Sequence, residues 1–316
     1  MQLPDDVIAQ VERRLDVRLD RSSPRTGAWA ESAGHRTDRD TWVRVDSRPP
    51  SWMQPQSWVG AEAASVIPGI PKPAWFQSAT WLDTSRERVW RAEEMELVTE
   101  PVVAVTGTML TAPPDLPHTW WAVLRAALAA LAGFRTCRVS GRQELITRRV
   151  SQMLGGTVDT TVTEWATSHG DLHWGNITAP GLYLLDWADW GLAPRGNDAA
   201  CLWASALAVP DTADRVHAEF RDDLDCRSGK IARLWGLQQH PAHGRQPRRR
   251  SRPRRAGQDR RRPARQRPAI AKGRGGDQMG EHTELDITVE ELTTVRSRNA
   301  VDGDGPTGDS GENKDG

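Results

Sequence analysis

Apolar and polar residues alternate along the first part of the chain with the period of β-strands. The segment 41–46 reads Thr-Trp-Val-Arg-Val-Asp, and two further strands are predicted over 74–82 and 89–97. The acidic segment 83–87 lies between these two strands, which favours a hairpin. With an opening helix that begins near Asp5, the pattern predicts a small, mostly antiparallel sheet covered by a helix.

The hydrophobic period changes after residue 112, where a proline-rich segment over 113–117 interrupts the chain. Apolar residues then recur at helical spacing, at Trp120, Leu124, Leu128 and Leu131. Further helices are predicted near 143–154, 199–208, 213–224 and 230–239. We therefore expect an α+β fold with two lobes, a sheet lobe over 1–112 and a mainly helical lobe over 113–240, with a cleft between them.

The last part of the chain has a different composition. Residues 245–267 contain twelve arginines in 23 positions, with prolines throughout and no apolar period. Residues 277–316 carry eleven Asp and Glu against three Arg and Lys, and the chain ends in a segment rich in Gly and Asp. Such segments bury too little apolar surface to fold. We expect residues 241–316 to be disordered and the helical lobe to be truncated where they begin.

Composition excludes several classes of protein. The cysteines, Cys137, Cys201 and Cys226, are far apart and form no Cys-x-x-Cys pair, which fits a reducing, cytoplasmic location. The first twenty residues lack the apolar run of a signal peptide, and no apolar stretch is long enough to span a bilayer. The formal net charge is zero, so charge alone indicates no partner.

The chemical signal lies in residues 168–177, Ser-His-Gly-Asp-Leu-His-Trp-Gly-Asn-Ile, followed by Leu-Leu-Asp-Trp at 184–187. Metal-assisted phosphoryl transfer needs one carboxylate to accept a proton from the attacking hydroxyl, and a second carboxylate and an amide oxygen to hold Mg²⁺. Asp171 and Asn176 share one loop, and a turn at 179–181 would bring Asp186 back to the same end as Asn176. The three side chains are therefore expected to converge.

This pattern resembles the His-Gly-Asp-x-His-x-x-Asn and Asp-Trp motifs of aminoglycoside phosphotransferases and their choline- and homoserine-kinase relatives. The resemblance implies a protein-kinase-like fold and transfer of the γ-phosphate of ATP, with Mg²⁺, to a hydroxyl of a small polar molecule. It implies Asp171 as the catalytic base and Asn176 and Asp186 as magnesium ligands. It also implies three residues that support the loop, namely His169, His173 and Asp198. Trp174 stands where the family often has proline.

The nucleotide site is less distinct in the sequence. The family uses a strand lysine tethered by a helix glutamate, and the matching positions here are Arg44 and Glu62, in a helix predicted over 58–67. Arginine binds phosphate but does not replace lysine neutrally. Arg44 could equally be a surface residue of an exposed strand. No Walker-type phosphate loop is present.

Other functions remain open at this stage. One is a catalytically inactive, truncated remnant that at most binds nucleotide. Another is a zinc site at His169 and His173, although no third ligand follows at short spacing. Nucleic-acid binding is confined to the basic tail over 245–267, which lacks stacking aromatic residues. The expected partner is a small-molecule hydroxyl acceptor, with no membrane partner, and the sequence does not indicate an oligomeric state.

Overall fold

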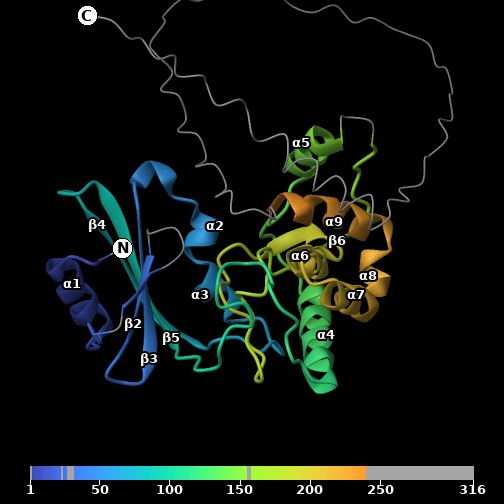
Figure 1. Cartoon of the computed structure of the whole chain (residues 1–316). Helices are drawn as coiled ribbons and strands as arrows, with labels where there is room; N and C mark the ends of the chain where they lie inside the picture. The colour runs from blue at the N-terminus through green and yellow to red at the C-terminus, as the bar shows by residue number, and fades with distance from the viewer. Residues whose placement is uncertain (1, 23, 27–31, 155–157, 240–316) are drawn as a thin grey trace, which may run out of the picture.

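The computed structural model of the chain describes residues 2–22, 24–26, 32–154 and 158–239. These residues form a sheet lobe and a mainly helical lobe that lie side by side (Figure 1). The predicted two-lobed α+β fold is thereby confirmed. The expected disorder of the tail concerns residues 241–316, which lie outside the described residues.

The N-terminal lobe is built on one antiparallel sheet with the strand order β1-β2-β3-β5-β4. Its strands are β1 (Arg25–Thr26), β2 (Ser32–Arg36), β3 (Thr41–Arg48), β4 (Trp75–Asp83) and β5 (Arg88–Glu96). β4 and β5 pair as the predicted hairpin. Helix α1 (Asp5–Leu15) covers one face of the sheet.

Strand alternation gives the sheet one apolar and one charged face. Val43 and Val45 of β3 are fully buried, and they pack with Trp90 of β5 and with α1. Burying a side chain of this kind contributes about 1.5–3 kcal/mol to stability. The opposite face carries charges, because Arg44 stands across from Glu93 and Asp46 stands across from Arg91.

Short helices connect β3 to β4. They are η1 (Pro50–Trp52), α2 (Pro55–Trp58) and α3 (Gly60–Ala64), where a single helix over 58–67 was predicted. Ala64, Ile67 and Ile70 are buried in the hydrophobic cluster of the C-terminal lobe rather than in that of the sheet. The segment that carries Glu62 therefore packs with the helical lobe, although it precedes residue 112 in the sequence.

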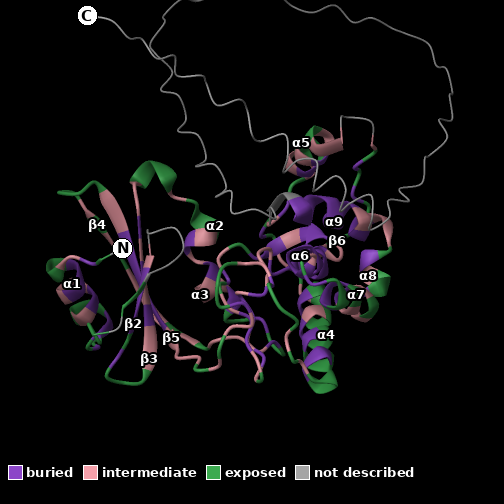
Figure 2. Cartoon of the chain, viewed as in Figure 1, coloured by how far each residue is buried: buried purple, intermediate pink, exposed green. Residues whose placement is uncertain are grey.

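The C-terminal lobe packs its helices around one core that is rich in tryptophan. Its helices are α4 (His118–Gly133), α5 (Gln143–Leu154), α6 (Asn197–Ala206), α7 (Pro210–Glu219), α8 (Arg221–Leu224) and α9 (Arg227–Gln239). Every residue of α6 is buried, and this helix lies at the centre of the lobe (Figure 2). Among the described residues, no helix combines the length and hydrophobicity needed to cross a membrane.

Candidate active site

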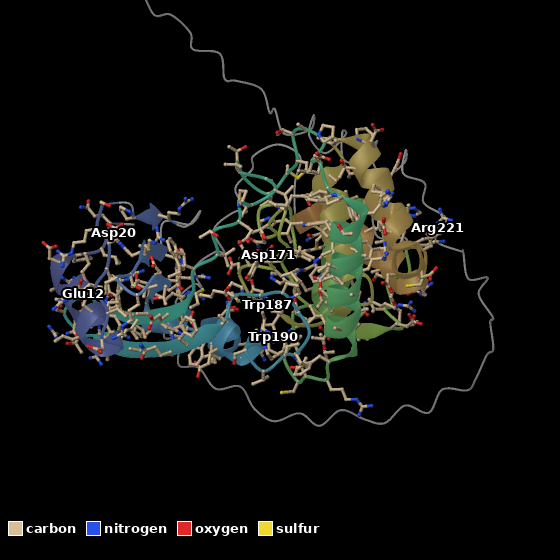
Figure 3. The ribbon with its side chains drawn as sticks, turned by 90° about the horizontal axis from the view of Figure 1, so that it is seen from below. Glu12, Asp20, Asp171, Trp187, Trp190 and Arg221 are labelled. Atoms are coloured by element: carbon tan, nitrogen blue, oxygen red, sulfur yellow. The ribbon has the colours of Figure 1, made fainter. Side chains whose placement is uncertain are left out.

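The loop after strand β6 (Trp165–Ser168) carries the predicted catalytic residue. β6 pairs antiparallel with β7 (Gly191–Pro194), and the pairing ends at Ser168. Beyond it, buried and partly exposed residues alternate, so that Leu172 and Trp174 enter the core while Asp171 stays partly exposed. Figure 3 shows Asp171 in the region between the two lobes.

Trp174 anchors this loop in the core. Its ring stacks on Trp120 at a centroid distance of 6.4 Å, and its Nε1 donates a hydrogen bond to the Leu202 carbonyl at 3.0 Å. The side chain is fully buried. A bulky aromatic residue at this position is therefore accommodated by the tryptophan-rich core of the lobe.

Asp198, in the first turn of α6, binds the start of the loop. Its carboxylate accepts hydrogen bonds from the backbone N–H groups of His169, at 2.7 Å, and Gly170, at 3.1 Å. It also accepts one from the Ser168 hydroxyl. Asp198 is buried, and these donors together with the positive end of α6 offset the cost of burying its charge.

The two histidines of the motif make different contacts. The buried His169 donates from Nε2 to the Leu185 carbonyl at 2.8 Å, which links the loop to the residue before Asp186. Its burial lowers its pKa, so the ring is neutral. His173 accepts a hydrogen bond at Nδ1 from the Gly175 N–H, and burial lowers its pKa to about 4. The neutral His173 ring therefore carries its proton on Nε2, 3.9 Å from Asp171 Oδ2.

Asn176 and the following turn bring the chain back towards Asp171. The Asn176 side-chain amide donates to the Asp171 carbonyl at 2.9 Å, so the amide oxygen faces away from that carbonyl. The Leu185 N–H donates to the Asn176 carbonyl at 2.8 Å. This pairing, across the turn at 179–181, holds Asp186 at the same end as Asn176.

The Asp171 carboxyl lies among other acidic groups. Its side chain is 42% exposed. Loss of hydration in the loop, followed by the negative charges of Asp186, Asp189 and Asp198, raises its pKa to about 7. A general base works best when its pKa lies near the working pH, and the pKa of Asp171 meets this condition at neutral pH.

Asp186 is held by an arginine of the sheet lobe. Arg44 Nη1 lies 2.8 Å from Asp186 Oδ1, and Arg44 Nε lies 2.9 Å from Asp46 Oδ2. The positive charge of Arg44 lowers the pKa of Asp186. The Asp186 backbone has φ 60°, a left-handed conformation that is uncommon for residues other than glycine. Arg44 therefore faces the site rather than the outer surface of the sheet.

The predicted pairing of Arg44 with Glu62 is wrong. Glu62 Oε2 lies 2.7 Å from Nη2 of Arg91, on the neighbouring strand β5. The physical reason is the strand register, since Arg91 stands across from Asp46, two residues along β3 from Arg44. The short helix α3 reaches that position, and Arg44 is left to Asp46 and Asp186.

Sequence reasoning did not single out Arg91. Its signal was the alternation of apolar and charged residues over Trp90, Arg91, Ala92 and Glu93. In a strand paired with β3, this alternation places Arg91 on the same face as Arg44. The site also includes the exposed Asp189, whose Oδ1 accepts a hydrogen bond from the Ser57 hydroxyl at 2.6 Å.

Asn176 and Asp186 are the residues that would hold a divalent cation. Mg²⁺ in nucleotide sites takes one or two protein ligands and completes its shell with phosphate oxygens and water. Within the described residues, no group of three or more His, Cys, Asp or Glu is arranged to hold a metal ion. The donor set fits a cation that a bound nucleotide helps to hold. Neither His169 nor His173 belongs to a group of three or more such ligands in the part of the chain that the structure describes.

No protein-family model matches the sequence, and no curated protein sequence matches it. The chain is, however, similar to several solved structures. A GDP and kanamycin complex of APH(2")-IIia aligns with a TM-score of 0.51 and 13% identity, over 73% of this chain and 88% of that chain. At this identity the likeness concerns the fold, and it confirms the predicted aminoglycoside-phosphotransferase-like, protein-kinase-like fold.

Two further structures align less closely. The amicoumacin kinase hAmiN, in complex with AMP-PNP, Ca²⁺ and Ami, gives a TM-score of 0.48 at 11% identity, over 74% of this chain and 86% of that chain. The macrolide 2'-phosphotransferase MphH from Brachybacterium faecium gives 0.46 at 15% identity, over 74% and 88%.

Proposed function

We propose that the chain is an ATP-dependent phosphotransferase that transfers the γ-phosphate to a hydroxyl of a small polar molecule of the aminoglycoside or amino-alcohol type. The observation that carries the proposal is the convergence of Asp171, Asn176 and Asp186. The Asn176 amide is bonded to the Asp171 carbonyl. The pKa of the Asp171 carboxyl is raised first by loss of hydration and then by the negative charge of Asp186.

In this proposal Asp171 is the catalytic base. Its carboxylate orients the acceptor hydroxyl and takes its proton as the oxygen attacks the γ-phosphorus. A new bond forms between the acceptor oxygen and phosphorus, the bond from phosphorus to the β,γ-bridging oxygen breaks, and ADP leaves. A pKa of about 7 keeps a large share of Asp171 ionised at neutral pH and lets it hold the proton afterwards.

Asn176 and Asp186 would bind Mg²⁺, and Arg44 would bind a phosphate of the nucleotide. The metal ion, when bound, neutralises charge on the nucleotide phosphates. His169 and Asp198 keep the loop in place through their hydrogen bonds to Leu185 and to the loop backbone. The binding of GDP and kanamycin by APH(2")-IIia supports a nucleotide and a small-molecule acceptor as ligands of this fold.

A second candidate is nucleotide binding without transfer. It is favoured by the contact between Arg44 and Asp186, because the guanidinium occupies one oxygen of the carboxylate that a metal would need. A chain in which Arg44 blocks Asp186 in this way would bind nucleotide but transfer no phosphate to any acceptor.

The test compares Asp171→Ala and Asp186→Ala with Asp214→Ala, which changes an exposed residue of α7. Calorimetry measures Mg·ATP affinity, and ADP release measures transfer to a panel of amino sugars and amino alcohols. Asp171→Ala should lower kcat by about 10²–10⁴-fold with nucleotide affinity retained. Asp186→Ala should weaken nucleotide binding by about tenfold or more. Equal loss of binding in both variants would contradict these roles, and binding without transfer by the native chain would favour the second candidate.

A further inference from the structure

We propose that Arg91 is a positioning residue that, through Glu62, couples the sheet to the loop that carries Asp186. The inference rests on the proposed function and deepens it, because it says which residue sets the approach of Arg44 to the site. Arg91 itself does not touch substrate in this proposal, since its side chain is only 6% exposed.

The first step is the attachment of Glu62 to the C-terminal lobe. Glu62 lies in α3, whose first residue is Gly60. Trp190 Nε1 donates to the Gly60 carbonyl at 2.9 Å, and a Cβ atom on Gly60 would lie 2.3 Å from the Trp187 carbonyl oxygen. Ala64, at the end of α3, is buried in the C-terminal core. Glu62 is therefore fixed to the segment that begins with Asp186.

The second step is the attachment of Arg91 to the sheet. It lies on β5, which is paired on both sides by β3 and β4. Its guanidinium donates to Glu93 at 2.8 Å and to the Thr80 hydroxyl at 3.3 Å, and both partners belong to the sheet. The same Nη2 atom donates to Glu62 at 2.7 Å. Arg91 thus joins the sheet to α3.

The third step concerns Arg44. It lies on the same charged face, and it makes the second ion pair between this face and the C-terminal lobe, to Asp186. Within the described part of the chain, Arg44 and Glu62 form no hydrogen bond or ion pair. Two separate contacts on one face fix both the distance and the tilt of the sheet over the Asp186 segment. If the contact between Arg91 and Glu62 is lost, the ion pair between Arg44 and Asp186 no longer has the second contact that fixes the tilt of the sheet.

A purely structural role for Arg91 makes a different prediction. Arg91 would then serve only to neutralise the buried Glu93, whose burial raises its pKa. In that case Glu62, whose side chain is 43% exposed, could be changed without effect on nucleotide binding. The effect of a change at Glu62 on nucleotide binding therefore distinguishes a positioning role of Arg91 from a purely structural one.

The experiment is a pair of double-mutant cycles on the full chain. One cycle combines Arg91→Gln with Glu62→Gln, and the other combines Arg44→Gln with Glu62→Gln. Each variant is measured for Mg·AMP-PNP affinity by calorimetry and for urea unfolding, with Glu144→Gln on α5 as the control glutamate. If Arg91→Gln does not fold, Arg91→Lys is measured in its place. It should keep part of the nucleotide affinity of the native chain, because lysine can still reach Glu62.

We expect Arg91→Gln and Glu62→Gln each to weaken nucleotide binding by about fivefold, and the double variant to be no worse than either. In the Arg44→Gln background, Glu62→Gln should have little further effect on nucleotide binding, because Glu62 acts on the site through the position of Arg44. Additive effects on nucleotide binding in either cycle, or unchanged nucleotide binding in Glu62→Gln, would overturn the proposal. If the native chain binds no nucleotide, the proposed function fails. The unfolding cycle then still tells whether Arg91 and Glu62 are coupled.

Discussion

Arg44 of the sheet and Asp186 of the C-terminal lobe form an ion pair at 2.8 Å, although 142 residues separate them in the sequence. Each charge stabilises the other, so the pKa of Arg44 is raised and that of Asp186 is lowered. A protein cation thus already lies against the carboxylate proposed to bind a metal ion. A bound metal ion would have to share Asp186 with Arg44 or displace Arg44 from it. The nucleotide phosphates would likewise have to share Arg44 with Asp186.

Replacing Arg44 should make the metal site more accessible in the absence of nucleotide. Arg44→Gln removes the competing positive charge, and we expect Mn²⁺, used as a probe for Mg²⁺, to bind the free protein about fivefold more tightly. The same change should weaken the binding of Mg·ATP, because a phosphate-binding cation is lost. Electron paramagnetic resonance measures free Mn²⁺ for the first quantity, and calorimetry measures the second.

The matched control is Arg36→Gln, which removes an arginine of the adjacent strand that pairs with the exposed Asp40. It should leave both affinities unchanged. Weaker binding of Mn²⁺ to Arg44→Gln in the absence of nucleotide would show that Arg44 does not compete with the metal.

Asp171 should make the folded chain less stable as the pH rises. Its pKa is about 7 in the folded chain, against about 3.9 for an unperturbed aspartate. Between these values the folded chain holds a proton that the unfolded chain has lost, so stability falls as the pH increases towards 7. The side chain is 42% exposed, so solvent screening reduces the cost to about 1 kcal/mol.

Asp171→Asn has no carboxyl to ionise at this position. Its free energy of unfolding should equal that of the native chain near pH 4 and exceed it by a growing amount up to pH 7, above which the difference is constant. Urea unfolding at a series of pH values measures it. A difference that does not depend on pH would mean that the Asp171 pKa is not raised.

Removal of Asp198 should destabilise the protein and disorder the loop over 168–177. Asp198→Ala leaves the N–H groups of His169 and Gly170 without their acceptor in a buried site, which costs about 2–4 kcal/mol. Urea unfolding measures this loss. Asp214→Ala, an exposed change on α7, should stay within about 0.5 kcal/mol of the native chain. Equal stabilities of the two variants would contradict the role of Asp198.

Adding a methyl group at Gly60 should separate α3 from the Asp186 segment. In Gly60→Ala the new Cβ would lie 2.3 Å from the Trp187 carbonyl oxygen, so the backbone must shift, at a cost of about 1–3 kcal/mol. Nucleotide affinity should fall as well, because Glu62 moves with the helix. Gly133→Ala, at the end of α4, meets nothing within 4 Å and should be neutral or slightly stabilising. Thermal unfolding and calorimetry distinguish the two variants.

Local patterns in the sequence were enough to predict most of the elements. The alternation over 41–46 became β3, and the two strands around the acidic segment became the β4–β5 hairpin. The helical spacing of apolar residues after residue 117 became α4, which starts at His118. These predictions succeeded because hydrophobic period and turn residues act over a few neighbouring positions.

The motif of the C-terminal lobe was also local. Asp171, Asn176 and Asp186 lie within one loop and one turn, so their placement depends on short-range geometry that the sequence specifies. Their chemical roles stay predictions until the variants above are measured.

The sequence by itself determined the sheet lobe, the helical lobe and the loop that gathers the acidic and amide side chains. Only the tertiary structure decided that Glu62 pairs with Arg91 and that Arg44 reaches Asp186. Strand register and the docking of α3 on the C-terminal core depend on contacts between segments far apart in the chain. A shift of two residues along a strand moves a side chain by about 6.6 Å on the same face, which is enough to exchange one ion-pair partner for another.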